Sequence, residues 1–463
     1  MQISATESDI ALAKQALQTL HAGYDRHIER SELDHQWAAF EAKAQQGMSR
    51  ETLYVELSLI LASIRCDHTK AELPKDMAKS RNTGRSYLPF RFVLFGDRMF
   101  IDTPAEDSGL SRGDEITEID GIAVSQWLQW IRPLVPVDGY ADHVKNSVIA
   151  YGTEFMGGAL DHFAPLISDL SSTVSLEVLS AGQPRQLQLD RLDYDDFLSL
   201  TGDKRYASNF ADAIRYQSIG QDVAYLAIDT FVNYRKPVDA MATLSPIFER
   251  VANEGRKTLI LDLRANGGGS DDAQAALLRH LIQQPIQPVS AIWTRFNQIP
   301  TDIRPYLWTW DAAALSPHPA WLRPLNNGYY RLDLPGSEAS SMLNPADQAF
   351  TGQLLVLTGP NNSSGSTHLL AALRTAGIGT FVGERTGGSP TGATAGILYY
   401  LTLPESGIRI RIPATRTVMA NAEALPKQNG LEPDVGVTVD ADSYFAGQDP
   451  VLQAAMRIAA GQR

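Results

Sequence analysis

The order of apolar and polar positions changes character along the chain. Over about residues 10–70 apolar residues recur at helical spacing, and Ser31 and Ser49 stand where helix N-caps are expected. Over about residues 90–193 the pattern becomes strand-like, with helical stretches inside it. The last half alternates short apolar strand runs with helical stretches, which is typical of an α/β fold with a largely parallel sheet.

These changes divide the chain into parts. We predict an N-terminal helical segment at 1–75, a β-rich domain at 85–193 with a helical insertion at about 125–168, a linker at 194–218 with room for one helix, and an α/β core at 219–463. In the core the pattern predicts strands at 223–228, 258–263, 354–358 and 379–382, and helices at 238–253, 272–282 and 367–376.

Composition narrows the functional classes. The chain has 463 residues and a formal net charge of −13, which repels phosphate backbones and disfavours a nucleic-acid binder. The single cysteine, Cys66, excludes disulfides within the chain and a Cys-rich zinc site. The first residues of the chain contain neither a basic region nor an apolar run. We therefore expect either a cytosolic protein or a periplasmic or secreted one whose signal peptide has been removed. We expect no membrane span.

A glycine-rich loop follows one predicted strand. The stretch 261–270 reads Leu-Asp-Leu-Arg-Ala-Asn-Gly-Gly-Gly-Ser, in which a buried strand runs into three glycines and an acidic helix start. Such a loop can aim main-chain N–H groups at one point, which suits an oxyanion hole or an anion site. The spacing is not that of a phosphate-binding P-loop. A flexible turn with a structural Asp-Arg pair is the alternative interpretation.

A second strand leads to a serine-rich helix start. Residues 354–373 contain an apolar strand, a Gly-Pro-Asn-Asn turn and then Ser363, Ser364 and Ser366 at the beginning of a small-residue helix. This arrangement can present a serine nucleophile, although serine is also an ordinary helix cap. His68 ends the helical opening segment, and His368 lies one turn into the serine helix. We rank His68 first as a candidate base, because His368 is expected to face the core or the sheet.

Three separated motifs resemble those of peptidase family S41, the serine peptidases that include the C-terminal processing (tail-specific) proteases and the catalytic core of tricorn. They are Asp-Leu-Arg-x-Asn-x-Gly-Gly at 262–269, the serine helix start, and Val-Gly-Glu-Arg-Thr-Gly-Gly at 382–388 with Gly-Leu-Glu-Pro-Asp at 430–434. Residues 108–121 also resemble a PDZ-like signature, and Asp67-His68-Thr69 resembles an N-terminal motif of one family branch. The resemblance implies a crotonase-like α/β core with a parallel-rich sheet, preceded by a helical segment and a PDZ-like β domain.

The resemblance also implies roles for individual residues. Ser364 would be the nucleophile, favoured over Ser363 and Ser366 by the 20-residue step to Glu384. The oxyanion hole would be formed by the amides of Gly268, with Gly269 as an alternative, and of Gly365. Losing one such donor typically costs roughly 2.7 to 4 kcal/mol of barrier. No metal or organic cofactor is implied, and the expected partner is a peptide or unfolded protein, with an oligomer left open.

The sequence departs from the tail-specific branch at the general base. That branch has a lysine where this chain has Ser389, so a Ser-Lys pair cannot be placed, and the tricorn-like branch points to His68 instead. Glu384 and Asp67 are candidates for the orienting acid, since Lys427, Gln428 and Asn429 stand where another acid is expected. We therefore expect a serine-type endopeptidase or carboxyl-terminal processing peptidase. The alternative is a catalytically inactive protein that binds peptides or hydrophobic ligands on the same scaffold.

Overall fold

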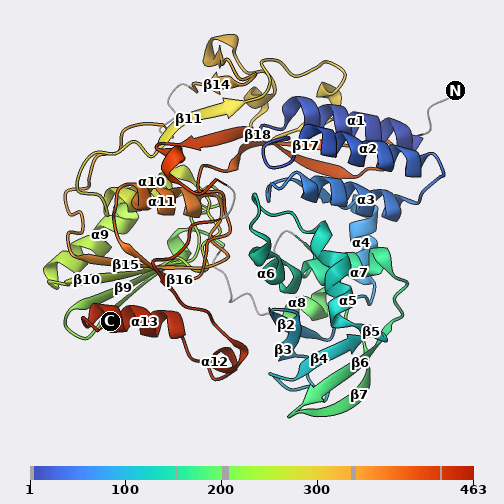
Figure 1. The fold of residues 1–463 in the computed structure, drawn as a ribbon, viewed down its shortest axis with the longest axis horizontal. Helices are drawn as coiled ribbons and strands as arrows, with labels where there is room; N and C mark the ends of the chain where they lie inside the picture. The colour runs from blue at the N-terminus through green and yellow to red at the C-terminus, as the bar shows by residue number, and fades with distance from the viewer. Residues whose placement is uncertain (1–4, 153–154, 201–207, 335–339, 428–429, 463) are drawn as a thin grey trace.

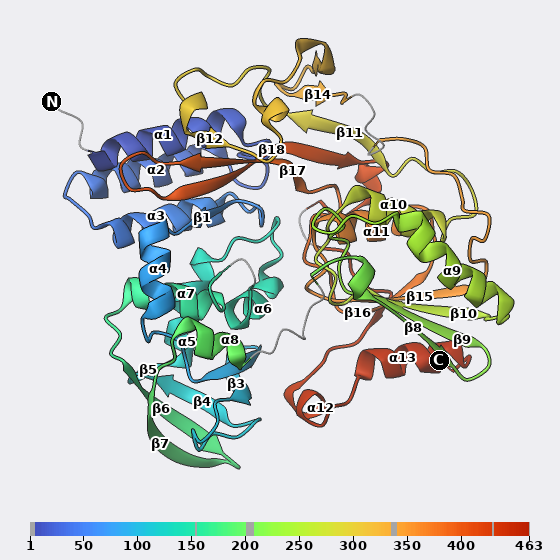
Figure 2. The same ribbon diagram turned by 180° about the vertical axis from the view of Figure 1, so that it is seen from behind.

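The computed structural model describes residues 5–152, 155–200, 208–334, 340–427 and 430–462. Figures 1 and 2 show N-terminal helices at one end of a long antiparallel sheet, a β domain below them, and a parallel-sheet core beside both. One hydrophobic cluster runs through the N-terminal helices, the β domain and strands of the long sheet. The parts predicted from the sequence therefore share packing, because apolar faces that no part could cover alone are buried against the next.

The N-terminal segment forms three helices, α1 (Ala5–Leu20), α2 (Arg30–Ala44) and α3 (Arg50–Ser63). Ser49 caps α3 as predicted, because its hydroxyl accepts a hydrogen bond from the Thr52 amide at 3.1 Å. The cap predicted at Ser31 is wrong: Ser31 lies inside the first turn of α2, and Glu29 is its N-cap residue. Buried aromatic side chains such as Trp37 and Tyr54 pack the helices together.

The β domain is a twisted antiparallel sheet in the order β2-β3-β4-β6-β7, with β5 paired to β4. Tyr87 and Leu192 form a bridge where the chain enters and leaves the domain. Its strands are β2 (Phe90–Phe95), β3 (Arg98–Pro104), β4 (Glu115–Ile119), β5 (Ile122–Ala123), β6 (Thr173–Ser180) and β7 (Gln183–Asp190). Its helices, with those flanking it, are α4 (Lys75–Thr83), α5 (Val124–Ile131), α6 (Lys145–Ala150), α7 (Ala159–Ile167) and α8 (Tyr194–Ser199).

The core sheet has the order β19-β16-β15-β10-β9-β8 and is parallel except for the β8–β9 pair. Its strands are β8 (Ile214–Ile219), β9 (Val223–Ile228), β10 (Thr258–Asp262), β15 (Gln353–Thr358), β16 (Thr380–Gly383) and β19 (Val435–Gly436). The associated helices are α9 (Ala240–Asn253), α10 (Asp271–Arg279), α11 (Ser364–Thr375), α12 (Ala441–Phe445) and α13 (Pro450–Ala459). Separate apolar clusters lie on the two faces of the sheet, one with α9, α10 and α11 and the other with α13.

The antiparallel sheet links the N-terminal segment to the core. Its order is β12-β17-β18-β11-β14-β13, and β1 also pairs with β18. The strands are β1 (Lys70–Glu72), β11 (Val289–Thr294), β12 (Leu307–Trp308), β13 (Leu322–Pro324), β14 (Tyr330–Leu332), β17 (Thr394–Thr402) and β18 (Arg409–Met419). In β1, Lys70 pairs with Arg411 and Glu72 with Arg409, so the turn just before Lys70 is fixed to the core.

The predicted core strands and helices are confirmed, with ends shifted by a few residues. In the expected linker, α8 occupies residues 194–199 and is the one helix allowed there. The end of the linker is wrong, because residues 214–218 belong to β8, an edge strand whose half-exposed alternation gives a weak signal. Residues 201–207 of that linker lie outside the described residues. Short 3-10 helices lie at Arg132–Leu134, Asp142–Val144, Ala211–Ala213, Arg304–Tyr306, Ala312–Leu315, Pro319–Trp321 and Ala422–Ala424.

Candidate active site

Ser364 is the first residue of α11, directly after the loop that leaves the buried strand β15. It has a left-handed backbone with φ of 49°, which is uncommon for a residue other than glycine and is typical of functional positions. Its side chain is half-buried, and its hydroxyl forms no hydrogen bond within the described part of the chain. The helix start thus presents a free hydroxyl beside main-chain N–H groups at the positive end of a helix dipole.

Ser363 ties this helix start to the N-terminal segment. Its hydroxyl donates a 2.5 Å hydrogen bond to Oδ2 of Asp67, across 296 positions of sequence. The sequence neighbour of Ser364 therefore holds the sequence neighbour of His68. This bond separates the roles of the two serines, because Ser363 is engaged with a carboxylate while Ser364 is not.

Asp67 and His68 form a close acid–imidazole pair. Nδ1 of His68 lies 2.5 Å from Oδ1 of Asp67, and both side chains are largely buried. Burial lowers the pKa of His68, but the negative charge of Asp67 outweighs burial, so the pKa lies well above its ordinary value. Burial raises the pKa of Asp67, while the charge of His68 and the hydrogen bonds from His68 and Ser363 lower it to below its ordinary range. A carboxylate in this position orients the imidazole and stabilises its protonated form.

The sequence reading missed a second carboxylate at this pair. Asp138 lies in the chain segment after α5, is 5% exposed, and accepts the Asp67 amide on Oδ1 at 3.1 Å. Its Oδ2 accepts the amide of Ser389 at 3.3 Å. Burial and the charge of Asp67 raise the pKa of Asp138 to about 7. No motif marks this residue, because Asp138-Gly139 reads as an ordinary turn.

The glycine loop packs directly against the serine. A Cβ atom on Gly268 would lie 2.8 Å from the Gly365 nitrogen and 2.9 Å from Cβ of Ser364, and Gly268 has φ of 104°. The Gly268 amide itself donates to Oδ1 of Asn266 at 2.8 Å, so this predicted oxyanion donor is already engaged. The amides of Gly269 and Gly365 donate no hydrogen bond to any described residue. These two N–H groups are therefore unoccupied within the described residues, and that of Gly365 directly follows Ser364.

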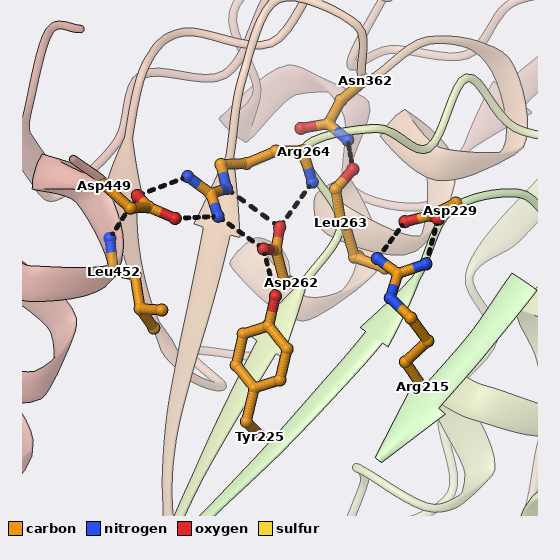
Figure 3. Close-up of polar contacts among 9 residues, drawn as sticks. All are labelled: Arg215, Tyr225, Asp229, Asp262, Leu263, Arg264, Asn362, Asp449 and Leu452. Carbon is orange, nitrogen blue, oxygen red and sulfur yellow. Dashed lines mark hydrogen bonds and ion pairs between the residues drawn. The ribbon is translucent and has the colours of Figure 1, made fainter. Parts of the chain in front are cut away.

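The remainder of the first motif fastens the loop to the sheet. Figure 3 shows Arg264 between two carboxylates, with hydrogen bonds to Asp262 and to Asp449 at the start of α13. Tyr225 donates to Asp262 at 2.8 Å. Asn362, two residues before Ser364, donates to the Leu263 carbonyl at 2.5 Å, so the glycine loop and the serine loop are bonded to each other.

The third motif supports the serine loop from its other side. The Asn362 carbonyl accepts the amides of Gly387 and Gly388 at 2.9 and 2.8 Å. A Cβ atom on Gly388 would lie 2.8 Å from Cα of Ser363, so no larger residue fits without displacement. Glu384 lies in this motif, but no ion pair joins it to His68 in the described part of the chain. Burial raises the pKa of Glu384. The carboxylate that the structure places against His68 is Asp67, and the role predicted for Glu384 stays untested.

His368 and Ser389, the residue at the position expected for a lysine, both form hydrogen bonds within the protein. His368 Nε2 accepts the Ala393 amide at 2.9 Å, and burial lowers its pKa to about 4. Its ring therefore supports the neighbouring loop. At Ser389, where the tail-specific branch has a lysine, the hydroxyl accepts a hydrogen bond from the guanidinium of Arg26 at 2.9 Å. Arginine stays protonated and does not serve as a base there.

One cluster has ligand types that could hold a metal. Cys66, Asp67, His68 and Asp138 offer donor atoms that lie within 4.8 Å of one another. Each is engaged within the protein: Cys66 donates to the Thr394 carbonyl, Asp67 contacts His68, and Asp138 accepts two amides. Burial also raises the pKa of the Cys66 thiol, which disfavours the thiolate that metals bind. The arrangement is explained by these contacts.

Residues 222–437 match the model of Peptidase family S41. This part of the chain belongs to peptidase family S41. The matched segment contains the glycine loop, the serine helix and the third motif, whereas Asp67, His68 and Asp138 lie before it. Family S41 comprises serine-type peptidases, so the match indicates serine peptidase chemistry. No curated protein matches the chain.

Solved structures with the same fold include mature CPAF complexed with lactacystin, with a TM-score of 0.62 at 15% identity over 99% of both chains. An S499A mutant of CPAF matches with a TM-score of 0.61 at 15% identity, over 95% of this chain and 93% of that one. A candidate peptidase from Parabacteroides merdae ATCC 43184 matches with a TM-score of 0.50 at 14% identity, over 98% and 96%. The likeness extends over nearly the whole chain and shows a shared mixed α/β fold. Within the described residues, no helix combines the length and the apolar character that crossing a membrane requires.

Proposed function

We propose that this S41 protein is a serine peptidase in which Ser364 is the nucleophile, His68 the general base and Asp67 the acid that orients His68. The observation that carries the proposal is the Ser363–Asp67 hydrogen bond, which brings together two segments 296 positions apart, each with a catalytic candidate next to it. Peptide hydrolysis requires this combination, since a serine hydroxyl attacks a carbonyl only when a nearby base accepts its proton.

In the proposed reaction His68 takes the hydroxyl proton of Ser364 as its oxygen attacks the scissile carbonyl carbon. Asp67 stabilises the imidazolium through Nδ1. The amides of Gly365 and Gly269 stabilise the developing oxyanion, with Gly268 contributing shape at the same point. Protonation of the leaving amine by His68 releases the first product and leaves an acyl-enzyme, which a water molecule hydrolyses in the reverse sequence of proton transfers.

We also propose a crotonase-like core and a PDZ-like β domain. The parallel sheet supports a crotonase-like core, and the turn at residues 108–114 supports a PDZ-like β domain, since Asp114 accepts the Ser111 amide there. In a PDZ domain a peptide binds between the edge strand and a helix. Here α6 packs on the edge strand β2 and α7 packs on α5. This packing favours a β domain that supports the core over one that captures peptide ends.

The substrate is proposed as a peptide or unfolded protein, in keeping with the family. A carboxyl-terminal processing activity, a periplasmic or secreted location and an oligomeric state all stay predictions. A second candidate function, ligand binding without hydrolysis, is favoured by one observation: the Gly268 amide is occupied by Asn266. A fluorophosphonate probe separates the two, because only an activated serine reacts with it.

The test replaces each proposed residue singly. We expect Ser364→Ala and His68→Ala to abolish casein or peptide hydrolysis and fluorophosphonate labelling, with a cost of about 10⁴-fold or more in kcat. His35→Ala, an exposed histidine on α2, is the matched control and should retain activity. Folding is checked by thermal denaturation. Stoichiometric labelling at a serine other than 364, or unchanged turnover in either variant, would contradict the assignment.

A further inference from the structure

The segment after α5 connects the β domain to the turn that carries the proposed base. Gly139 donates its amide to the Arg65 carbonyl at 3.0 Å, and the Arg65 guanidinium donates back to the Gly139 carbonyl at 3.0 Å. The guanidinium also lies 4.2 Å from the ring centre of Tyr140, whose hydroxyl donates to the His27 carbonyl at 2.6 Å. Arg65 has a left-handed backbone, with φ of 59°. The contacts of Arg65 with Gly139 and Tyr140, which we call the clasp, hold a strained turn directly before the Asp67–His68 pair.

Asp138 is the group inside this clasp that reaches the catalytic pair. Its two oxygens accept two main-chain amides from different parts of the molecule. One is the amide of Asp67, in the turn that carries His68, which we call the base turn. The other is the amide of Ser389, in the loop that follows Gly387 and Gly388. That loop is bonded to Asn362 through Gly387 and Gly388. One buried carboxylate thus links the base turn to the support of the nucleophile.

Ionising a carboxylate in this place is costly. Burial and a neighbouring negative charge both disfavour its ionised form. The charged or titratable groups around it are Asp67, His68 and Cys66 on the base turn and Arg26 on the chain after α1. A buried acid with this cost, placed against a catalytic pair, suggests a role in the reaction rather than in folding.

We propose that Asp138 is a positioning residue, which fixes the main chain of Asp67 and of Ser389 and thereby holds the Asp67–His68 pair against the serine loop. The inference rests on the proposed function above and extends it to a residue of the β domain. It means that peptidase activity depends on how the β domain is seated, because Asp138 comes from that domain.

The test compares two substitutions of different severity. Asp138→Asn keeps the shape and one acceptor oxygen, whereas Asp138→Ala removes both acceptors. We expect kcat to fall about 10-fold in the first and about 100-fold in the second, with KM within about twofold of the wild type. Asp97→Asn is the matched control, since the Asp97 side chain lies in the same domain and is 66% exposed. Equal losses in the two Asp138 variants would show an effect of charge alone and would overturn the positioning role, as would a change confined to KM.

A second readout does not depend on hydrolysis. In Ser364→Ala protein labelled with ¹⁵N-histidine, the pKa of His68 can be followed by NMR. We expect it to be lower in Asp138→Asn, lower still in Asp138→Ala, and unchanged in Asp97→Asn, because loss of Asp138 removes a negative charge and loosens Asp67. If the wild type neither hydrolyses peptides nor reacts with the probe, the proposed function fails, and this graded shift still supports the positioning role. An unmoved His68 in Asp138→Ala overturns it.

Discussion

The two sides of the candidate site are built in different ways. On the S41 side, Ser364 and the glycine loop follow adjacent parallel strands, β15 and β10, so strand pairing alone brings them together. Hydrogen bonds between neighbouring loops, such as that from Asn362 to Leu263, then fix their spacing. This side of the site therefore depends on one sheet and on two neighbouring loops that contact each other.

On the other side, His68 and Asp67 stand on a turn that has no place in the parallel sheet. Three of the ties that hold this turn are the pairing of β1 with β18, the bond from Ser363, and the bond to Asp138. Each is a contact between segments distant in sequence. The proposed nucleophile is thus positioned by the core itself, whereas the proposed base is positioned by docking of the helical segment and the β domain. Substitutions on the two sides should therefore lower the peptidase activity in measurably different ways.

Among the substitutions that distinguish the two sides, Gly268→Ala on the core side has the largest expected effect. A methyl group there would clash with the Gly365 nitrogen and with Ser364, and φ of 104° is unfavourable for alanine. We expect Gly268→Ala to lower kcat by about 10³-fold, because the loop must move away from the oxyanion position. The measurement is steady-state kinetics with a peptide substrate, together with the rate of fluorophosphonate labelling.

Gly267→Ala is the matched control for this substitution. A Cβ atom at Gly267 meets nothing closer than the Asn361 carbonyl oxygen at 3.8 Å, and its φ is outside the left-handed region. Activity should stay within a few-fold of the wild type. Equal losses in both variants would mean that the loop is sensitive to any added methyl group, and would contradict the specific contact at Gly268.

The next effect lies on the docked side, at Asp67. We expect Asp67→Asn to lower kcat/KM by about 10²-fold or more, because the imidazole loses the charge that orients it. His68 must be neutral to accept a proton, and Asp67 raises its pKa, so wild-type activity should rise with pH above the ordinary histidine value. Removing the charge lowers that pKa, and the acidic limb of the kcat/KM profile should move to lower pH.

The control for Asp67 is Asp34→Asn, at an exposed carboxylate on α2. Its pH profile should superimpose on that of the wild type. An acidic limb that stays in place in Asp67→Asn would show that Asp67 does not set the protonation of His68. Glu384 would then become the stronger candidate for the orienting acid, and Glu384→Gln would be expected to move the limb instead.

Sequence reasoning recovered the core side better than the docked side for a physical reason. Strands β9, β10 and β15 are buried on both faces and give continuous apolar runs, and the loops that follow them carry glycine and serine in recognisable order. The strands and the loops after them could therefore be predicted from the pattern, and the family resemblance then implied that Ser364 and Gly268 act together. That the Gly268 amide is bonded to Asn266 could not be predicted, because it depends on one side-chain rotamer.

The docked side depends on contacts that leave little trace in sequence. His68 was named through a resemblance, but β1 has only three residues, and its pairing with β18 cannot be inferred from so short a run. Asp138 lies 71 positions from Asp67 and sits in an ordinary-looking turn. The hairpin of β17 and β18 was not predicted, since its burial does not alternate regularly. Long-range docking, rather than local pattern, places β1 and Asp138.

The smallest expected effect concerns Ser363, where the two sides meet. Ser363→Ala removes one hydrogen bond to a buried carboxylate while leaving β1 and Asp138 in place, and a bond of this kind contributes about 1.5 to 3 kcal/mol. Since the other two ties remain, we expect a loss of about 10-fold in kcat at the low end of that range, with labelling still confined to Ser364. The control is Ser290→Ala, at a half-buried serine on β11 whose hydroxyl donates to a carbonyl, and it should leave kcat unchanged.

The double variant Ser363→Ala/Asp138→Asn makes the comparison sharper. If the two ties act on the same turn, the combined loss in kcat should differ from the product of the single losses. Independent losses would mean that Asp67 is held by the two contacts without cooperation, and complete loss of labelling in Ser363→Ala alone would make Ser363 the nucleophile.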